Sequence, residues 1–162
     1  MLKLQVQGRG ECLPTSIAMI LGVPKQQVLD LFQNLDPLHR TFTEIYRGNS
    51  NTFWPCTWRV LDHAFGPAAV KAYQETVGWN GEDGRGGLWA TGGKGAPAPF
   101  PQTGRGLLQL IFASEDGRFM RRHTVAYSEG LLYDPAEQLV CTWEEYEARC
   151  PGWKIEGVIP TP

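Results

Sequence analysis

The spacing of apolar residues changes near Gly106, and this change constrains the fold more than any other feature of the chain. Before it, apolar residues recur three or four positions apart, which is typical of amphipathic helices. After it, they alternate with polar residues or form short runs between turns, which is typical of antiparallel strands. The order predicts an α+β fold, with N-terminal helices packed on a C-terminal antiparallel sheet.

Length and composition suit a single domain over residues 1–162. The apolar fraction of 42% and the charged fraction of 20% are ordinary for a globular protein. A net charge of −2 gives no electrostatic footprint for nucleic acid, so no nucleic-acid partner is expected. The one basic concentration, Arg118, Arg121 and Arg122, is expected to be a solvated strand end.

The location and the cofactor needs of the chain are also predicted from its composition. The N-terminal residues lack the apolar stretch of a secretion signal, and no run of about 18 apolar residues could span a membrane. We therefore expect a cytoplasmic protein that does not engage a membrane. The cysteines Cys12, Cys56, Cys141 and Cys150 lack the spacing of a zinc site, so neither a metal nor another cofactor is expected.

Three helices are predicted in the first half of the chain from apolar residues at helical spacing. The pattern of residues 38–51 is weak, residues 48–51 are expected to be a loop from their composition, and residues 68–73 a short strand or turn. The predicted helices run from just after Cys12 to Gly22, from Pro24 to Leu35, and from about Pro55 to Phe65.

Residues 78–106 form a segment with ten glycines and three prolines, a composition that does not favour a helix. A loop of this length in a compact domain is usually functional or disordered. Its aromatic residues favour packing on the rest of the molecule, either as a surface insertion or as a lid over a substrate. Trp89 within it is a predicted substrate contact.

A sheet and one helix are predicted beyond Gly106. The helix begins after Thr142, because Thr142 and Glu145 have the spacing of a capping box. The predicted strands are 107–113, 122–128, 131–133 and 154–159.

Cys12 lies at the start of the first predicted helix. Free backbone N–H groups in a first helical turn favour a thiolate over a thiol. Thr15 and Ser16 are expected to bond locally to these amides. A cysteine at a helix start can also be an ordinary core residue, so only its partners can identify a nucleophile.

His123 begins one predicted strand, and Asp134 ends the next. An antiparallel hairpin that turns near residues 129–130 brings these two positions side by side. A histidine can remove the proton of a thiol, and a carboxylate can fix the tautomer of that histidine. The pattern predicts Cys12 as nucleophile, His123 as base and Asp134 as its orienting partner. A glutamine just upstream of Cys12, with a backbone N–H, would stabilise an oxyanion.

A helix-borne cysteine, a strand-borne histidine and a hairpin-partner aspartate, in this chain order, resemble the papain-like cysteine peptidases. The closer similarity is to the bacterial peptidase domains that cleave after double-glycine leaders and to their small stand-alone relatives in bacteria and phages. Leu13 stands where that family usually has glycine. The matching residues are Gln7, Glu11-Cys12, Pro14 and Ala18-Met19-Ile20-Leu21 in the first block, and His123-Thr124-Val125-Ala126-Tyr127 and Tyr133-Asp134-Pro135 in the second.

The resemblance implies an oxyanion glutamine six residues before the nucleophile. Gln7 lies five residues before Cys12 and Gln5 seven, so either can serve, and Gln7 is preferred. Gly10 and Glu11, next to the nucleophile, are predicted to contact the substrate.

The resemblance implies hydrolysis of a peptide or amide bond, after small residues such as Gly-Gly, with a peptide or protein as substrate. Two alternatives stay open. One is a thiol acyltransferase or amidase of the same fold. The other is a catalytically inactive papain-like binding module that uses the aromatic, glycine-rich segment as its contact surface. The sequence does not indicate an oligomeric state.

Overall fold

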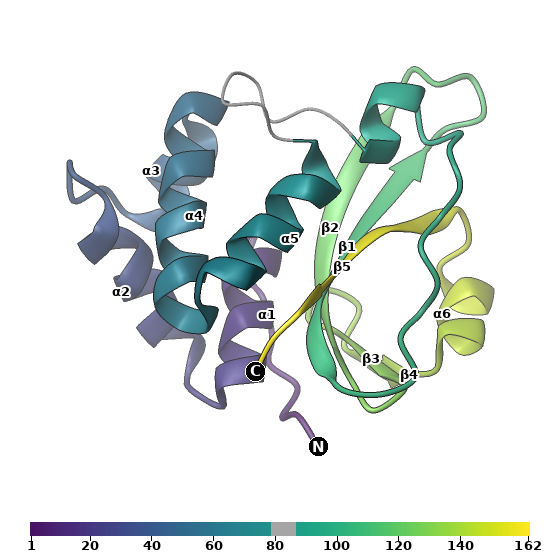
Figure 1. Cartoon of the computed structure of the whole chain (residues 1–162), viewed down its shortest axis with the longest axis horizontal. Helices are drawn as coiled ribbons and strands as arrows, with labels where there is room; N and C mark the ends of the chain where they lie inside the picture. Colours follow the sequence, from purple (N-terminus) through teal and green to yellow (C-terminus); the bar gives the residue numbers. More distant parts are fainter. Residues whose placement is uncertain (79–86) are drawn as a thin grey trace.

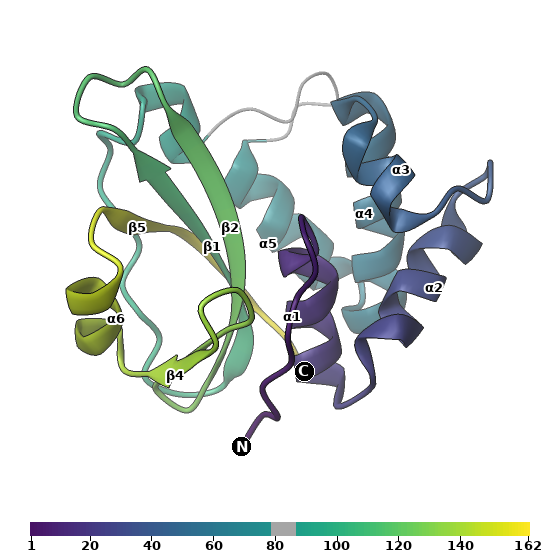
Figure 2. The ribbon, with the colours of Figure 1, turned by 180° about the vertical axis from the view of Figure 1, so that it is seen from behind.

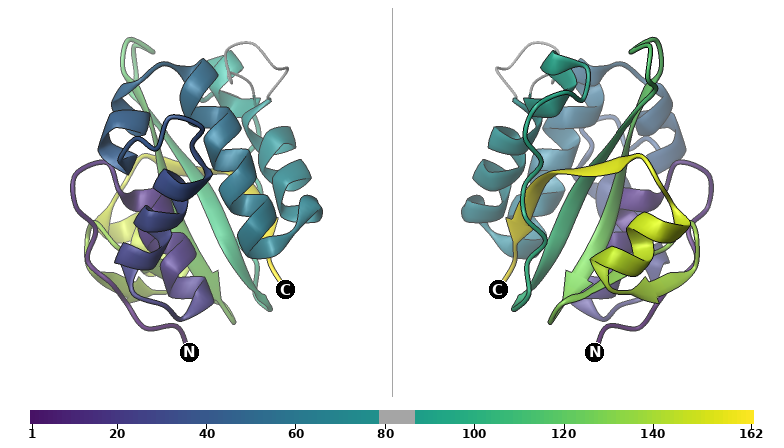
Figure 3. Two further views of the ribbon diagram at one scale, coloured as in Figure 1. Left: turned by 90° about the vertical axis from the view of Figure 1, so that its left-hand side faces the viewer. Right: turned by 90° about the vertical axis from the view of Figure 1, so that its right-hand side faces the viewer.

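The computed structural model describes residues 1–78 and 87–162, and in this part the chain has an α+β fold (Figure 1). A layer of helices covers one face of an antiparallel sheet, and one short helix covers the other face (Figure 3). The elements in chain order are α1 (Cys12–Leu21), α2 (Lys25–Leu35), α3 (Phe42–Arg47), α4 (Ser50–Phe65), α5 (Pro67–Val77), the 3₁₀ turn η1 (Gly87–Thr91), β1 (Arg105–Ala113), β2 (Met120–Ser128), β3 (Leu131–Asp134), β4 (Leu139–Cys141), α6 (Trp143–Arg149) and β5 (Trp153–Pro160).

The five strands lie in the order β4-β3-β2-β1-β5, and all neighbouring pairs are antiparallel. β1 pairs with β2 along its whole length, from Arg105 opposite Ser128 to Ala113 opposite Met120. β3 is much shorter, and its ladder with β2 ends where Tyr133 lies opposite Ala126. In the described part of the chain, the first half of β2 therefore has a strand partner on one side only.

The dipeptide Asp134-Pro135 explains why this ladder stops. The register of β2 and β3, if continued, would place Pro135 opposite Thr124. Proline has no N–H to donate to a ladder, so strands end or bulge at such positions. The edge of β2 near Thr124 is left open, and α1 lies against β2 there (Figure 2).

Two apolar cores lie on the two faces of the sheet. The larger core joins the helices to the sheet, and the smaller core lies between the sheet and α6. Alternate residues of β2 face different cores, since Ala126 belongs to the larger one and Val125 and Tyr127 to the smaller one. Burial on both faces holds β2 at the centre of the molecule.

The first two predicted helices are confirmed as α1 and α2. Gly22 ends α1 in the left-handed conformation, with φ 68°. The predicted third helix begins earlier, because α4 starts at Ser50 and contains Pro55 in its interior. The preceding turn carries Trp54 into the larger core, and this burial outweighs the hydrogen bond that proline removes.

Two further segments of the helical layer differ from the predictions. Residues 68–73 are not a strand or turn but belong to α5, in which Ala69, Tyr73 and Val77 are buried one turn apart. The helical spacing could not be recognised within residues 68–73, because the third buried residue, Val77, lies beyond that segment. Within 38–51, α3 is an unpredicted helix of six residues, with the side chain of Thr41 accepting the backbone N–H of Glu44.

The predicted strands and the capped helix of the second half are confirmed, and β4 is an additional short strand. Among the described residues of the predicted loop 78–106, residues 87–91 form η1 and the last two residues begin β1, and residues 79–86 lie outside the described part. In residues 1–78 and 87–162, no helix combines the length and apolar character that crossing a membrane requires.

Candidate active site

The thiol of Cys12 lies where the start of α1 meets the open edge of β2. Burial by itself would raise the pKa of this thiol. The His123 ring beside it and the backbone N–H groups of Thr124 and Leu13 outweigh burial, so the pKa of Cys12 is lowered. No acidic side chain occupies the first turn of α1, where the free backbone N–H groups favour a thiolate. The predicted thiolate environment is present.

His123 links the thiol to Asp134. Its Nε2 lies 2.9 Å from Oδ1 of Asp134, and this contact leaves Nδ1 as the ring nitrogen that can serve Cys12. Burial disfavours the charged ring, but the hydrogen bond with Asp134 and the interaction with Cys12 raise the pKa of His123 to about 10. The structure brings together all three residues of the predicted set, and the lowered thiol pKa with the raised imidazole pKa favours a thiolate–imidazolium pair.

Asp134 is fully buried and is held by several donors. Its Oδ1 also accepts the backbone N–H of Ala136 at 2.8 Å and that of Glu137 at 3.2 Å. Its Oδ2 accepts the hydroxyl of Tyr146 at 2.8 Å. Burial would raise the pKa of Asp134, but His123 and these donors lower it, so the carboxylate stays ionised.

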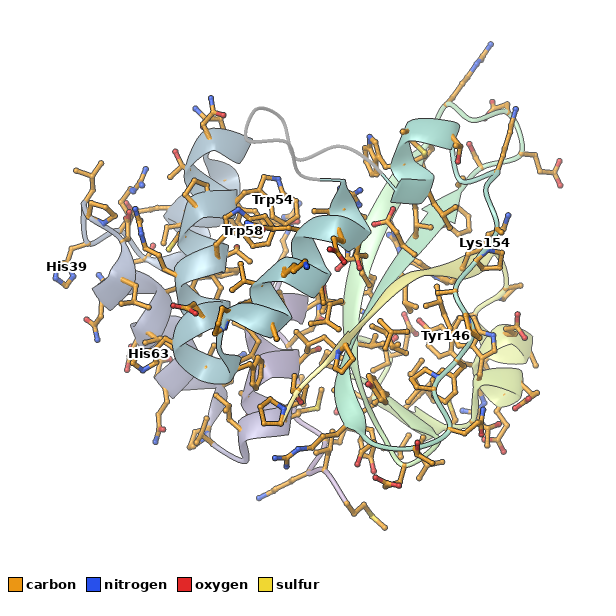
Figure 4. The ribbon with its side chains drawn as sticks, viewed as in Figure 1. His39, Trp54, Trp58, His63, Tyr146 and Lys154 are labelled. Atoms are coloured by element: carbon orange, nitrogen blue, oxygen red, sulfur yellow. The ribbon has the colours of Figure 1, made fainter. Side chains whose placement is uncertain are left out.

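Two aromatic residues near this pair were missed by sequence reasoning. Tyr146 reaches Asp134 from α6, on the face of the sheet opposite the helical layer (Figure 4). Trp153 begins β5, and its ring centroid lies 5.8 Å from that of His123, whose side chain is only 12% exposed. A buried tyrosine hydroxyl needs an acceptor, but the sequence could not show which acceptor the short helix would meet.

The two candidate glutamines have different environments. Both ends of the Gln5 amide are engaged, since Nε2 donates to the carbonyl of Val23 at 2.8 Å and Oε1 accepts the N–H of Lys25 at 2.9 Å. Gln7 instead has a buried Oε1 that meets no hydrogen-bond partner in the part of the chain that the structure describes. The backbone N–H of Gln7 donates to the carbonyl of Pro135 at 3.2 Å, which holds its segment beside the residue after Asp134. The geometry favours Gln7 over Gln5 for a role at the site.

Glu11 and Gly10, predicted to contact a substrate, shape the loop before the nucleophile. The Glu11 carboxylate accepts the N–H of Gly8 at 2.7 Å and forms an ion pair of 2.6 Å with Lys25. Gly10 has a φ of 74°, and a Cβ there would collide with the ring of Tyr46. These contacts fix the path by which the chain enters α1.

Trp89, the third predicted substrate contact, lies in η1 against the sheet. The guanidinium of Arg122 lies 4.8 Å from the centroid of the Trp89 ring, and the backbone N–H of Trp89 donates to the Glu156 carboxylate at 3.2 Å. Arg122 and the buried Glu156 form an ion pair of 3.0 Å. The expectation of a solvated basic cluster is therefore wrong for Arg122, because a buried carboxylate on β5 requires a charged partner.

The remaining cysteines and histidines do not share these features. Burial raises the pKa of Cys56 to about 11, and its thiol donates to the Phe32 carbonyl at 3.5 Å, as expected of a core residue. Burial also raises the pKa values of Cys141 and Cys150. His39 and His63 lie on the outer side of the helical layer, away from the sheet (Figure 4).

The described residues contain no cluster of three or more histidine, cysteine, aspartate or glutamate side chains that could hold a metal ion. Comparison of the chain with models of known protein families, with curated proteins and with solved structures finds no match.

Proposed function

We propose that the protein is a papain-like cysteine peptidase that hydrolyses peptide bonds through Cys12, His123 and Asp134. The observation that carries this proposal is that the three side chains meet, with His123 Nε2 2.9 Å from Asp134 Oδ1 and the His123 ring beside the Cys12 thiol. In this arrangement the pKa of the Cys12 thiol is lowered and that of the His123 ring is raised. Such shifts in opposite directions favour the charged forms of both groups, which is the resting state that a thiol nucleophile requires. Pairs of titratable groups with strongly shifted pKa values are concentrated at functional sites.

The reaction follows from the positions of these groups. The Cys12 thiolate attacks the carbonyl carbon of the substrate, and the C–N bond breaks as His123 gives its proton to the leaving amine. His123 then takes a proton from water, which attacks the thioester and releases the carboxylic acid product and the Cys12 thiolate. Asp134 holds the ring in one tautomer and supports its positive charge in both steps.

Gln7 and the backbone N–H of Cys12 are the proposed donors to the oxyanion. The first N–H groups of a helix have no partner within the helix, and α1 begins at Cys12. Within the described residues, Oε1 of Gln7 has no hydrogen-bond partner, whereas both ends of the Gln5 amide are bonded. Donors that are already oriented toward the developing charge contribute strongly to acyl transfer.

The proposed substrate is a peptide with small residues, such as Gly-Gly, before the bond that is cleaved. The resemblance of the Cys12 and His123 motifs to the double-glycine peptidases supports this preference. The small stand-alone members of that family, in bacteria and phages, are the proposed relatives of this chain. The proposed setting is the cytoplasm, and no cofactor takes part in the proposed reaction.

A peptide-library digest tests the activity. A mixture of peptides from an unrelated proteome is incubated with the wild-type protein and with Cys12→Ala, and new termini are identified by mass spectrometry. We expect new termini only with the wild-type protein, with glycine enriched before the cut. Cys56→Ala is the matched control, because that thiol is buried and has a raised pKa. Identical peptide patterns for the wild-type protein and Cys12→Ala would refute the peptidase proposal.

A further inference from the structure

Ser16 connects the helix that carries the nucleophile to the strand that carries the base. It lies one helical turn after Cys12, on the same side of α1. Its hydroxyl donates to the backbone carbonyl of Thr124 at 3.1 Å, and Ser16 is fully buried. Thr124 directly follows His123 on β2. The expectation that Ser16 bonds locally within its own helix is wrong, and the bond it makes is a long-range one.

The backbone of Thr124 is available because the sheet ladder ends early. β3 stops at Asp134, so no strand residue pairs with Thr124 on that side within the described residues. α1 supplies the missing partners instead. The Ser16 hydroxyl donates to the Thr124 carbonyl, and the backbone N–H of Thr124 bonds the sulfur of Cys12 and lowers the pKa of its thiol. One helical turn of α1 thus replaces one strand position.

Thr124 is itself held firmly from the opposite side. Its hydroxyl donates to Oε1 of Gln109 at 2.8 Å, and the hydroxyl of Tyr73 donates to the same oxygen at 2.6 Å. Thr124, Gln109 and Tyr73 are all buried. The Thr124 carbonyl that accepts from Ser16 is therefore held in place, and the hydrogen bond fixes the position of α1 relative to it.

We infer that Ser16 is a positioning residue for the proposed thiol chemistry, which fixes α1 against β2 so that Cys12 meets His123. Apolar packing alone is not directional, and the rest of the contact between α1 and the sheet is largely apolar. A hydrogen bond adds a preferred direction and length. A displacement of about 1 Å at reacting groups can lower a rate on the order of 100-fold. The inference rests on the proposed function, because it assigns Ser16 to the same site.

The test compares two hydroxyl deletions on the same helical turn. Ser16→Ala removes the bond to β2. Thr15→Val is the matched control, because Thr15 is equally buried but its hydroxyl donates at 2.7 Å to the carbonyl of Glu11, the residue just before α1, and not to the sheet. Iodoacetamide labelling of Cys12 is followed as a function of pH by peptide mass spectrometry. This profile reports the thiolate fraction, which a loss of stability alone does not move.

We expect Ser16→Ala to lower Cys12 labelling at about pH 6 by roughly 10-fold and to shift the profile to higher pH by about one unit. Thr15→Val is expected to stay within about 2-fold of the wild-type protein. If Ser16→Ala shows no cooperative unfolding transition, and so is not folded, Ser16→Cys takes its place. Its side chain keeps nearly the same volume, but a thiol is a weak hydrogen-bond donor. Fragmentation of the labelled peptide in the mass spectrometer then assigns the label to Cys12. Labelling that is equal in the Ser16 and Thr15 variants overturns the inference. An ordinary thiol profile in the wild-type protein would instead refute the proposed function.

Discussion

The two ends of the candidate site are held in different ways. At the carboxylate end, Asp134 accepts hydrogen bonds from four donors, of which two are backbone groups only two and three residues further along the chain. At the thiol end, Cys12 depends on groups of β2, more than a hundred residues away in sequence. The carboxylate end is therefore built mainly from local structure, whereas the thiol end is built from tertiary contacts.

This difference separates stability from reactivity. Removing a donor from the buried Asp134 leaves a carboxylate oxygen with fewer partners, which costs free energy of folding. Changing a group at the thiol end shifts Cys12 relative to His123, while the cores on both faces of the sheet stay packed. We expect substitutions at the thiol end to act mainly on chemistry and those at the carboxylate end to act on folding as well.

The largest effect is expected for His123→Ala. Without the imidazolium, the main causes that lower the pKa of Cys12 are lost while burial still raises it, so the thiolate fraction at about pH 6 falls on the order of 1,000-fold. In the wild-type protein, labelling rises as Cys12 loses its proton at low pH. Peptide hydrolysis declines again as His123 loses its proton near its pKa of about 10. Iodoacetamide labelling of Cys12 across a pH series measures the first change, and turnover across the same series measures the second.

His63→Ala is the matched control, because His63 lies on the outer side of the helical layer (Figure 4). It should label like the wild-type protein. If His123→Ala retains wild-type labelling at about pH 6, the ion pair with Cys12 is not formed, and the comparison between the two ends loses its basis.

A smaller effect, confined to turnover, is expected for Gln7→Ala. Loss of an oxyanion donor lowers the rate of acyl transfer by about 100-fold, whereas the labelling of Cys12 should change by less than about 2-fold because the thiolate does not need this donor. Turnover of a peptide identified in the library digest and the labelling rate together measure this split.

Gln5→Ala serves as the control, and we expect it to lower stability and not turnover. It removes two hydrogen bonds at the start of α2, so the free energy of unfolding should fall by about 1–2 kcal/mol with little change in turnover. Denaturant unfolding measures this loss. Equal turnover in Gln7→Ala and the wild-type protein would remove Gln7 from the oxyanion site.

The parts of the site that sequence predicts are the parts defined by local structure. A helix start places Cys12, and a hairpin places His123 beside Asp134, so the spacing of turn residues was sufficient for both. The hydroxyl partner of Asp134 could not be predicted in this way, because Tyr146 meets it only after α6 has packed on the sheet. The bond between Ser16 and Thr124 similarly depends on where α1 docks.

The same distinction explains the success and failure for the fold. The strands of the second half are bounded by glycine, proline and acidic turn residues, which mark their ends locally. In α5, by contrast, the buried positions extend from Ala69 to Val77, and a short apolar window could not distinguish a helix from a strand. The structure shows a helix here because the buried side of α5 packs against β5 and α4, and these contacts are not visible in the sequence.

Among His123→Ala, Gln7→Ala and Tyr146→Phe, the smallest loss of activity is expected for Tyr146→Phe, at the carboxylate end. The substitution keeps the ring in its core but removes the donor to Oδ2 of Asp134. The free energy of unfolding should fall by about 1–3 kcal/mol, because a buried carboxylate oxygen loses its partner. Cys12 labelling at neutral pH should fall by less than about 10-fold, because His123 and two backbone N–H groups still hold Oδ1. Denaturant unfolding and labelling are measured on the same preparation, with Tyr46→Phe as the control, since that ring is 51% exposed. A large loss of labelling without any loss of stability would reverse the comparison, and it would make the carboxylate end the part of the site that acts mainly on chemistry.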